Sequence, residues 1–404
     1  MIRAEIGGWT RDHHVRQTAY KGMEPGRDPL EVVKELAVDP AAAEREAEAT
    51  SLAPEPVAPA RGLPSDSGAV PKRPAAPKLP DPTWLVSEAE LDALAAIKGE
   101  GTWKVSGQEL KLTNLDKVLF PPADGSGEAP VTKRELIAYF ARIAPVMLPH
   151  LADRPLNLQR FPNGAGAPGF WQKDIPSSAP KWLTIWHETG FRERDDRKAN
   201  DHLLADRAAT LCWLGNQAAF EIHAWTSTTD EPWTPTFALI DIDPGTKTTW
   251  DETLVLARLY RTALEHLGVR AYPKVTGSRG IQAWIPIERG RYTYQDTSAW
   301  VEKLSRAVGA SVPQLVSWEW TKADRGGKAR LDYTQNAPIK TLVAPYAVRP
   351  RNGAPVSAPI RWEELDDPSL TAGRWSVRTL PARVAELGDL WAGMQEDQQV
   401  LPAL

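Results

Sequence analysis

Residues 37–83 contain no aromatic side chain, and this gap divides the sequence into two unequal parts. The segment between Ser51 and Pro82 holds 9 prolines, with Ala, Ser and Lys around them. Proline fixes φ and lacks an N–H donor, and so few apolar side chains cannot offset the entropy that folding costs. We therefore expect residues 37–83 to form an extended, semi-rigid linker without a core of its own.

The side chains that can build a hydrophobic core follow this linker. From Trp84 onward the chain carries 16 of its 17 tryptophans, and aromatic side chains supply much of the burial energy of a core. With 404 residues, 42% of them hydrophobic, a wholly disordered protein is excluded. We expect a short piece at 1–36, the linker at 37–83, a globular body at 84–395 and a tail at 396–404.

Cysteine content, hydropathy and charge exclude several protein classes. The single cysteine, Cys212, excludes a disulfide scaffold and a zinc site built from cysteines. No apolar run reaches the roughly 18–20 residues that span a bilayer, and the first residues do not resemble a signal peptide. We therefore expect a cytoplasmic protein without membrane contact. The net charge of -4 excludes a basic coat over the whole surface but permits a local basic groove.

Helix and strand signals alternate along the body. Capping boxes that begin at Thr132 and Thr249 precede apolar residues at helical spacing, and a third capped helix is expected near Asp296. Runs rich in apolar and β-branched residues predict strands at 237–243, 271–276, 281–287 and 329–333. This order predicts a mixed α/β or α+β fold, and excludes a helix bundle and an all-β sandwich.

Two aspartates at the end of an apolar strand are the most specific chemical signal. Asp241 and Asp243 stand two residues apart in the run IDIDPG, so their side chains point to the same face of a strand. Two carboxylates this close repel each other and are costly to desolvate unless a cation neutralises them. Mg²⁺ and Mn²⁺ prefer such oxygen ligands, so the pair predicts a metal site. The alternative is a turn, because Asp is common before Pro-Gly.

A glycine-containing loop follows, with the sequence VTGSRG at 275–280. Small residues between two strands allow backbone N–H groups to approach an anion, and the hydroxyls of Thr276 and Ser278 and the guanidinium of Arg279 lie alongside. The loop matches neither a Walker motif nor a dinucleotide-binding fingerprint. The alternative is a hairpin turn with an exposed arginine.

Other candidates gain meaning only in combination. Asp332 lies in an apolar strand context, where a lone aspartate is usually structural, but it can complete the pair of Asp241 and Asp243. The basic residues Lys340 and Arg349 follow it.

Aromatic and basic residues also alternate from Arg160 to Lys173, around Phe170 and Trp171. Such side chains can stack bases and hold phosphates, although core aromatics near a turn give the same pattern. His223, taken singly, is typical of a structural histidine.

Together these segments resemble the polymerase domain of the bacterial end-joining DNA ligases of the ligase D type, which belongs to the archaeo-eukaryotic primase superfamily. The resemblance extends over residues 96–395. It is carried by LTNLDKVLFP at 112–121, RFPNG at 160–164, EIH at 221–223, the two-aspartate motif, the glycine loop, and DYTQN at 332–336 with Lys340 and APY at 344–346. It implies a catalytic core with a central, mostly antiparallel sheet flanked by helices.

The resemblance also implies a role for each candidate residue. The catalytic, metal-binding carboxylates would be Asp241, Asp243 and Asp332. The nucleotide-binding residues would be His223, Thr276, Ser278, Arg279, Lys340, Arg349, Phe170 and Trp171. A 5′-phosphate on the downstream DNA strand would be held by Asn114, Lys117 and Lys133, with Arg160 and Lys173 as further contacts to DNA or nucleotide. Lys133 also opens a capped helix, where free N–H groups and the helix dipole favour an anion.

The sequence departs from the family at two places. Gln282 stands where the family often carries a histidine after the glycine loop, so a role for an imidazole there is in doubt. Loop 121–131 is longer than the usual connection and could shift Lys133 relative to Lys117.

Residues 1–36 carry a second resemblance, to the last strand and tail of the ligase OB domain. It rests on GWTRD at 8–12, VRQTAYKG at 15–22 and PLEVV at 29–33. So short a piece cannot form an OB barrel. We expect a vestige that is poorly ordered, docked on the body, or used to bind a partner.

The resemblance implies a template-dependent DNA or RNA polymerase that fills short gaps and extends DNA ends in non-homologous end joining or gap repair. It would use two divalent ions, Mn²⁺ or Mg²⁺, and readily accept ribonucleotides. Its partners would be gapped or broken DNA with a 5′-phosphate, NTP or dNTP, an ATP-dependent DNA ligase and a Ku-type end-binding protein, at the bacterial nucleoid in the cytoplasm.

Two alternatives stay open: a metal-dependent nuclease or phosphoesterase, and a non-catalytic module that binds DNA ends. The cations Arg279, Lys340 and Arg349 argue against hydrolysis, because a triphosphate needs that much positive charge and a hydrolytic water does not. The three intact aspartates argue against a non-catalytic module.

Overall fold

The computed structural model describes residues 2–9, 15–23, 85–188 and 200–404. The chain divides into two units, residues 1–72 and 73–404, and each is described by itself. The first unit contains an antiparallel hairpin of β1 (Ile2–Trp9) and β2 (Val15–Met23). The linker expected at 37–83 lies outside the described residues.

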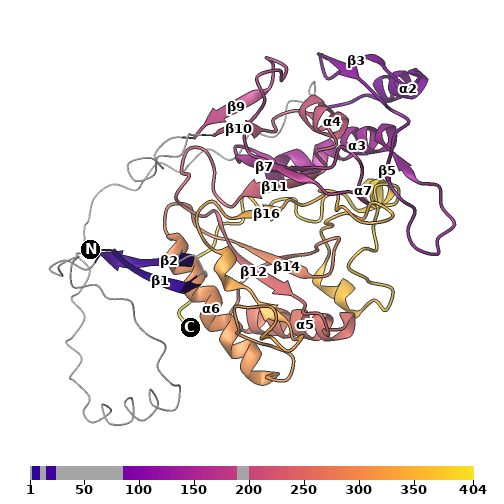
Figure 1. The fold of residues 1–404 in the computed structure, drawn as a ribbon. Coiled ribbons are helices and arrows are strands. Elements are labelled where there is room, and N and C mark those ends of the chain that lie inside the picture. Colours follow the sequence, from indigo (N-terminus) through magenta and orange to yellow (C-terminus); the bar gives the residue numbers. More distant parts are fainter. Residues whose placement is uncertain (1, 10–14, 24–84, 189–199) are drawn as a thin grey trace, which may run out of the picture. The chain divides into compact units, whose positions relative to one another are not determined.

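The second unit is built around two antiparallel sheets (Figure 1). The larger sheet contains, in spatial order, β16 (Thr341–Val343), β11 (Glu221–Trp225), β7 (Leu156–Arg160), β10 (Asp201–Leu204) and β9 (Thr184–His187), with β8 (Phe170–Gln172) paired to β7. The smaller sheet contains β13 (Tyr272–Val275), β14 (Ile281–Pro286), β12 (Phe237–Asp243) and β15 (Arg330–Leu331). Two short ladders pair β3 (Gly101–Val105) with β4 (Gln108–Leu112), and β5 (Val118–Phe120) with β6 (Val131–Thr132).

Helices cover the two sheets from opposite sides (Figure 1). They are α2 (Glu88–Ala96), α3 (Lys133–Leu151), α4 (Ala208–Asn216), α5 (Trp250–His266), α6 (Tyr294–Ser311) and α7 (Leu380–Leu387). Helices α3 and α4 lie over the sheet that contains β7 and β11, whereas α5 and α6 lie under β12 and β14. Capping boxes at Thr132, Thr249 and Thr293 begin α3, α5 and α6, which confirms the helices predicted there.

Strand β12 separates two hydrophobic clusters, because its side chains alternate between the faces of the sheet. Ala238, Ile240 and Ile242 belong to the main core of the unit. The side chains on the opposite face contribute to a second cluster, which consists of Phe237, Leu239, Trp284, Leu342, Trp391 and Met394. Since Leu342 comes from β16 of the larger sheet, this second cluster packs the two sheets against each other.

The predicted mixed α/β class is confirmed, and the antiparallel strands form two principal sheets instead of one. The strand predicted at 329–333 is shorter than expected. It ends at Leu331, because the Asp332 side chain accepts a hydrogen bond from the Thr334 N–H and begins a 3₁₀ turn. The tail at 396–404 packs on the same unit through the buried Leu401. Among the residues placed by the structure, no helix is both long and apolar enough to cross a membrane.

Candidate active site

Two neighbouring strands bring the three predicted carboxylates to one edge of the smaller sheet. Asp241 and Asp243 continue the face of β12 that carries Phe237 and Leu239, as their spacing predicted. Asp332 directly follows β15, which pairs with β12, and its backbone N–H donates to the Asp241 carbonyl at 2.8 Å. All three aspartates are half-buried. Strand pairing therefore assembles three carboxylates from distant parts of the sequence.

The surroundings of Asp241 disfavour its charge. Burial raises the pKa of Asp241 to about 7, and the negative charges of Asp332 and Asp243 contribute in the same direction. A hydrogen bond from Gln282 Nε2 to Asp241 Oδ1, at 3.1 Å, acts in the opposite direction. A divalent cation relieves this kind of repulsion and prefers carboxylate ligands. The donor set at this edge therefore fits Mg²⁺ or Mn²⁺.

Two arginines hold the other carboxylates, and sequence reasoning assigned no role to either of them. Arg325 Nη1 lies 3.6 Å from Asp243 Oδ2, and Arg330 Nε lies 3.2 Å from Asp332 Oδ1. Within the described ranges, no group of three or more His, Cys, Asp or Glu side chains converges into a ready-made metal site. The carboxylates share an edge, but Asp243 and Asp332 each face an arginine, whereas Asp241 faces the amide of Gln282. Arg325 therefore occupies one side of the Asp243 carboxylate in this structure.

The glycine loop between β13 and β14 is closed by a buried threonine. Thr276 Oγ1 donates to the Gly280 carbonyl and accepts from the Gly280 N–H, both at 3.1 Å. Gly277 has φ of +68°, and a Cβ there would lie 2.6 Å from the backbone of Val356. Both features require glycine at this position. The Thr276 hydroxyl thus shapes the loop, and its predicted contact with a nucleotide stays a prediction.

Cations lie on and near this loop. Arg279 is exposed, and Ser278 is half-buried with its Oγ accepting from Arg351 Nε at 3.0 Å. Arg351 is a further cation that sequence reasoning missed. Lys340 is exposed just before β16, and its ammonium group has no hydrogen bond or ion pair within the described residues. The structure links Ser278 to Arg351, but it does not draw Lys340 into the same network.

A buried carboxylate, Glu221, connects two of the predicted nucleotide-binding residues. Its Oε1 lies 3.0 Å from His223 Nε2 and 3.2 Å from Arg349 Nη2. Burial by itself favours the neutral acid, but the hydrogen bond with His223 and the charge of Arg349 outweigh it and lower the pKa of Glu221. The Trp171 ring packs edge-on against His223, with centroids 4.9 Å apart. The spacing of two residues on β11, which puts Glu221 and His223 on one face, is the signal that could have identified Glu221.

A basic cluster forms where β5, α3 and β7 approach one another. Burial lowers the pKa of Lys133, and the positive charges of Lys117 and Arg160 lower it further. The ammonium groups of Lys133 and Lys117 each donate to a backbone carbonyl, at 3.0 and 2.6 Å respectively. The Arg160 guanidinium lies 5.4 Å from the ring centroid of Phe170, which is itself exposed. Asn114 is exposed in the turn before Lys117. The structure therefore brings the predicted phosphate-binding lysines together with Arg160.

The expectation of free N–H groups at the beginning of α3 is wrong. The N–H groups of Lys133 and Arg134 donate to backbone carbonyls of the preceding turn, each at 2.9 Å, and the Glu135 N–H donates to Thr132 Oγ1. These donors are occupied because the β5–β6 pairing lays the turn onto the helix end. The backbone N–H of Lys133 donates to the Lys117 carbonyl, so the long loop between β5 and β6 has not separated the two lysines.

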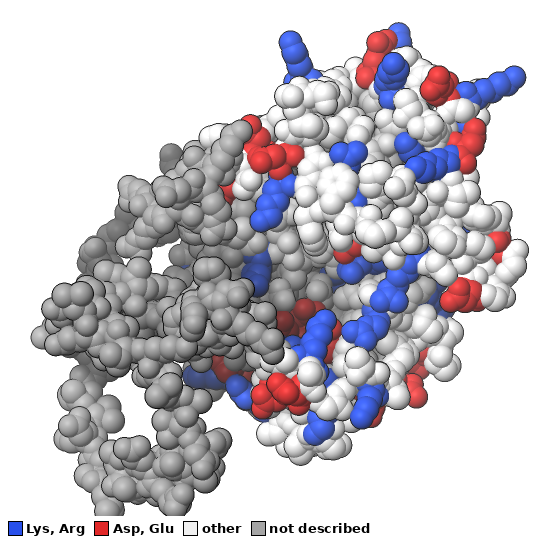
Figure 2. All heavy atoms as spheres, in the orientation of Figure 1, with Lys and Arg blue, Asp and Glu red and all other residues white. Residues whose placement is uncertain are grey.

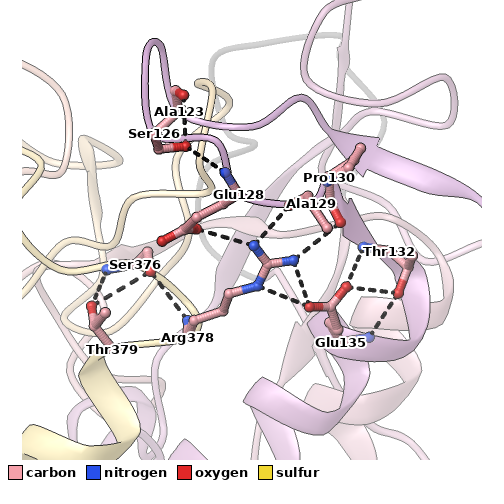
Figure 3. Close-up of polar contacts among 10 residues, drawn as sticks. All are labelled: Ala123, Ser126, Glu128, Ala129, Pro130, Thr132, Glu135, Ser376, Arg378 and Thr379. Carbon is pink, nitrogen blue, oxygen red and sulfur yellow. Dashed lines mark hydrogen bonds and ion pairs between the residues drawn. The ribbon is translucent and has the colours of Figure 1, made fainter.

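Arg378 fixes the long loop 121–131 against the beginning of α3 (Figure 3). Its guanidinium donates to the Glu128 carboxylate at 3.1 Å and to two carbonyls of the loop at 2.7 and 3.1 Å. It also donates twice to Glu135 Oε1, at 2.8 and 3.0 Å. Glu135 in turn accepts from the Thr132 N–H through its other oxygen, at 2.9 Å. One arginine thus joins the loop, the capping box and the segment before α7.

The surface carries a local concentration of positive charge despite the net charge of -4. Figure 2 shows Lys and Arg side chains across the middle of one face, with acidic side chains among them. This mixed surface agrees with the composition, which excludes a basic coat over the whole surface but permits a local basic groove. Lys173 is one of the exposed cations, next to the exposed Trp171 of β8.

Comparison with known proteins gives consistent results. The family described as LigD, primase-polymerase domain, matches residues 132–391. The chain is 33% identical over 310 residues to the multifunctional non-homologous end joining DNA repair protein LigD of Mycobacterium tuberculosis, covering 74% of this chain and 39% of that protein. It is 29% identical over 280 residues to the bifunctional non-homologous end joining protein LigD of Bacillus subtilis, covering 69% of this chain and 43% of that protein. The chain spans less than half the length of these relatives.

A solved structure has the same architecture. The polymerase domain from Mycobacterium tuberculosis ligase D, in complex with DNA, superimposes with a TM-score of 0.62 at 32% sequence identity. The match covers 72% of this chain and 99% of that domain. The similarity therefore extends over nearly the whole of that domain.

Proposed function

Since this chain belongs to the LigD primase-polymerase family, whose domain is a metal-dependent nucleotidyltransferase, we propose that it is a template-dependent polymerase of DNA end joining. It would fill short gaps and extend DNA ends. The observation that carries this proposal is the meeting of Asp241, Asp243 and Asp332 at one edge of the smaller sheet, through the hydrogen bond between β12 and the end of β15. We assign the activity to residues 84–395, and regard residues 1–36 as a vestige joined by the linker at 37–83.

We assign Asp241, Asp243 and Asp332 as ligands of two divalent ions, Mg²⁺ or Mn²⁺. When bound, the ions supply Lewis acidity that favours ionisation of the primer 3′-hydroxyl and positive charge that neutralises the triphosphate. The protein holds the three carboxylates on adjacent strands, and Gln282 orients Asp241 through its amide. An amide at this position donates a hydrogen bond without titrating, unlike the histidine that the family often carries.

We assign the incoming nucleotide to the glycine loop together with residues of β11 and β8. Positive charge for the triphosphate comes from Arg279, Arg349 and Lys340, with the hydroxyls of Ser278 and Thr276 nearer the loop. Glu221 fixes Arg349 and His223 relative to each other, at 3.2 and 3.0 Å. The exposed rings of Phe170 and Trp171 offer stacking surfaces for bases. Acceptance of ribonucleotides as well as deoxynucleotides is part of this proposal.

The DNA substrate is assigned as a gap or a broken end with a 5′-phosphate on the downstream strand. Asn114, Lys117 and Lys133 would hold that phosphate, and Arg160 lies close enough to depress the pKa of Lys133. The names of the relatives support a place in non-homologous end joining, and the solved relative is a complex with DNA. An ATP-dependent DNA ligase and a Ku-type end-binding protein are the partners that we propose for it. Such a polymerase would act at the bacterial nucleoid, in the cytoplasm.

Extension of a labelled primer in a gapped duplex tests the proposal. The purified chain is incubated with the four dNTPs, or the four NTPs, in Mn²⁺, in Mg²⁺ or in EDTA. We expect templated lengthening of the primer with either ion and none in EDTA. Shortening of the primer would instead identify a nuclease, and an unchanged primer with retained DNA binding would identify a non-catalytic end-binding module.

A further inference from the structure

Loop 317–328, between α6 and β15, presents an exposed tryptophan beside the carboxylates. Trp320 is 69% exposed, more than any other large hydrophobic side chain among the described residues. The Arg330 guanidinium lies against its ring, 4.6 Å from the centroid. A ring this exposed adds little to the core, so packing does not explain its place.

The two arginines that hold the carboxylates also hold this tryptophan. Arg325 donates to the Trp320 carbonyl at 2.9 Å and to the preceding carbonyl at 3.0 Å. The same guanidinium lies 3.6 Å from Asp243, and Arg330 lies 3.2 Å from Asp332. The backbone and the ring of Trp320 are thus connected to two of the three carboxylates through one side chain each.

The order of strands gives the site two sides. The smaller sheet runs β13-β14-β12-β15. The glycine loop lies between β13 and β14, and it meets the end of β12 because Ile242 pairs with Ile281. Loop 317–328 precedes β15, whose Arg330 pairs with Asp243 on the other side of the same strand end. The carboxylates therefore lie between the glycine loop and the loop of Trp320.

This order has a consequence for the reaction assigned above. In phosphoryl transfer the attacking and leaving oxygens lie roughly in line on opposite sides of the phosphorus. If the pyrophosphate leaves toward the glycine loop, the primer hydroxyl must approach from the side of β15. An exposed indole on that side, with the exposed Lys322 two residues further along the chain, combines a stacking surface with a cation for a strand backbone.

We propose that Trp320 is a stacking platform for an unpaired base near the 3′ end of the primer strand. This inference rests on the proposed polymerase function, because that function places the primer on the β15 side. Phe170 and Trp171 lie on β8 of the other sheet, so Trp320 adds an aromatic contact that their assignment does not include. Base stacking is tolerant of sequence, so the contact would serve any 3′ tail.

Equilibrium binding to a duplex with a short single-stranded 3′ tail tests the platform. Fluorescence anisotropy of the labelled tail, without nucleotide, compares the wild type with Trp320→Ala, Trp320→Phe and Trp233→Ala. We expect Trp320→Ala to weaken binding about tenfold, and Trp320→Phe to retain most of the affinity because a phenyl ring still stacks. Trp233 is 43% exposed between β11 and β12, and its substitution serves as the control that should leave binding within about twofold of the wild type.

Abasic substitutions along the tail locate the base. For the wild type, one abasic position near the 3′ end should weaken binding about tenfold, and Trp320→Ala should be insensitive to that position. Equal affinities of Trp320→Ala and wild type, or the same abasic profile for both, would overturn the proposal. The exposed ring of Trp320 would then be assigned to contact with a protein partner. Because binding is measured without nucleotide or catalysis, failure of primer extension in the earlier assay would not imitate either outcome.

Discussion

The backbone N–H of Asp332 donates to the carbonyl of Asp241 at 2.8 Å, so the chain itself places the third carboxylate beside the first. This bond continues the antiparallel pairing of Ile242 with Leu331. The carboxylates therefore lie near one another even without a cation, and their repulsion is part of the free energy of the cation-free protein.

That repulsion predicts a pH dependence of stability. The pKa of Asp241 is raised from 3.8 to about 7, so the folded state binds this proton more tightly than the unfolded state does. The stability that proton binding contributes is fully present below pH 3.8 and is lost as the pH rises through about 7. In EDTA, Asp241→Asn should be more stable than the wild type at pH 8, by up to a few kcal/mol, and nearly equal at pH 4. Urea denaturation across this range checks the prediction; a difference that does not change with pH would refute it.

Arg325 should compete with metal for Asp243. The pair is 3.6 Å apart and Asp243 is 41% exposed, so the interaction contributes only about 0.2–1 kcal/mol. Arg325→Ala should therefore tighten Mn²⁺ binding by about two- to fivefold in the absence of nucleotide. Titration calorimetry measures this directly. Arg361→Ala, at an exposed position before a 3₁₀ turn, is the control; equal affinities of wild type and Arg325→Ala would show that the arginine does not compete.

The cluster of Lys117, Lys133 and Arg160 should distinguish DNA ends. A 5′-phosphate carries about one more negative charge than an internal diester, and each charge-assisted contact contributes roughly 1.5–3 kcal/mol. A gap with a 5′-phosphate should bind at least about tenfold tighter than one with a 5′-hydroxyl, and the preference should weaken with salt. Lys117→Ala with Lys133→Ala should abolish it while sparing phosphate-independent extension. The two gapped duplexes are titrated in parallel, and identical affinities for the wild type would contradict the assignment.

Arg378 should support this discrimination without touching DNA. It connects loop 121–131 to Glu135 in the first turn of α3, next to Lys133 (Figure 3). Arg378→Ala should reduce the preference for the 5′-phosphate several-fold, with little change in extension of a gap that carries a 5′-hydroxyl, and Arg378→Lys should restore part of it. Arg374→Ala removes a comparable surface ion pair with Asp367 and should have no such effect. An unchanged preference in Arg378→Ala would show that the loop is held by other contacts.

Local signals in the sequence predicted much of the fold. The capping boxes at Thr132 and Thr249 identified the beginnings of α3 and α5 because a cap is a contact between residues three apart. Alternation along β12 likewise placed Asp241 and Asp243 on one face. The separation of the strands into two sheets depends on which apolar faces meet, and no local pattern specifies that.

The arginines of the site could not be predicted in the same way. Arg378 lies 243 residues from Glu135, and Arg325 reaches Asp243 only because loop 317–328 returns to the end of β12. Such ion pairs are formed by tertiary approach, whereas the sequence shows only that many arginines are present. Asp332 was a candidate because of its apolar strand context, but only the family resemblance implied its role as the third carboxylate, since its pairing beside Asp241 leaves no trace in spacing.

Extension of a gapped duplex by one nucleotide, in Mn²⁺, with the variants Asp241→Ala and Asp332→Ala tests the central assignment most directly. Each variant should extend the primer at least about a hundredfold more slowly than the wild type, because each removes a carboxylate that no neighbour replaces. Both should bind the gapped duplex with nearly the wild-type affinity, and Asp251→Ala, at an exposed aspartate in the first turn of α5, should extend normally. Extension by either active-site variant within about tenfold of the wild type would contradict the three-carboxylate site.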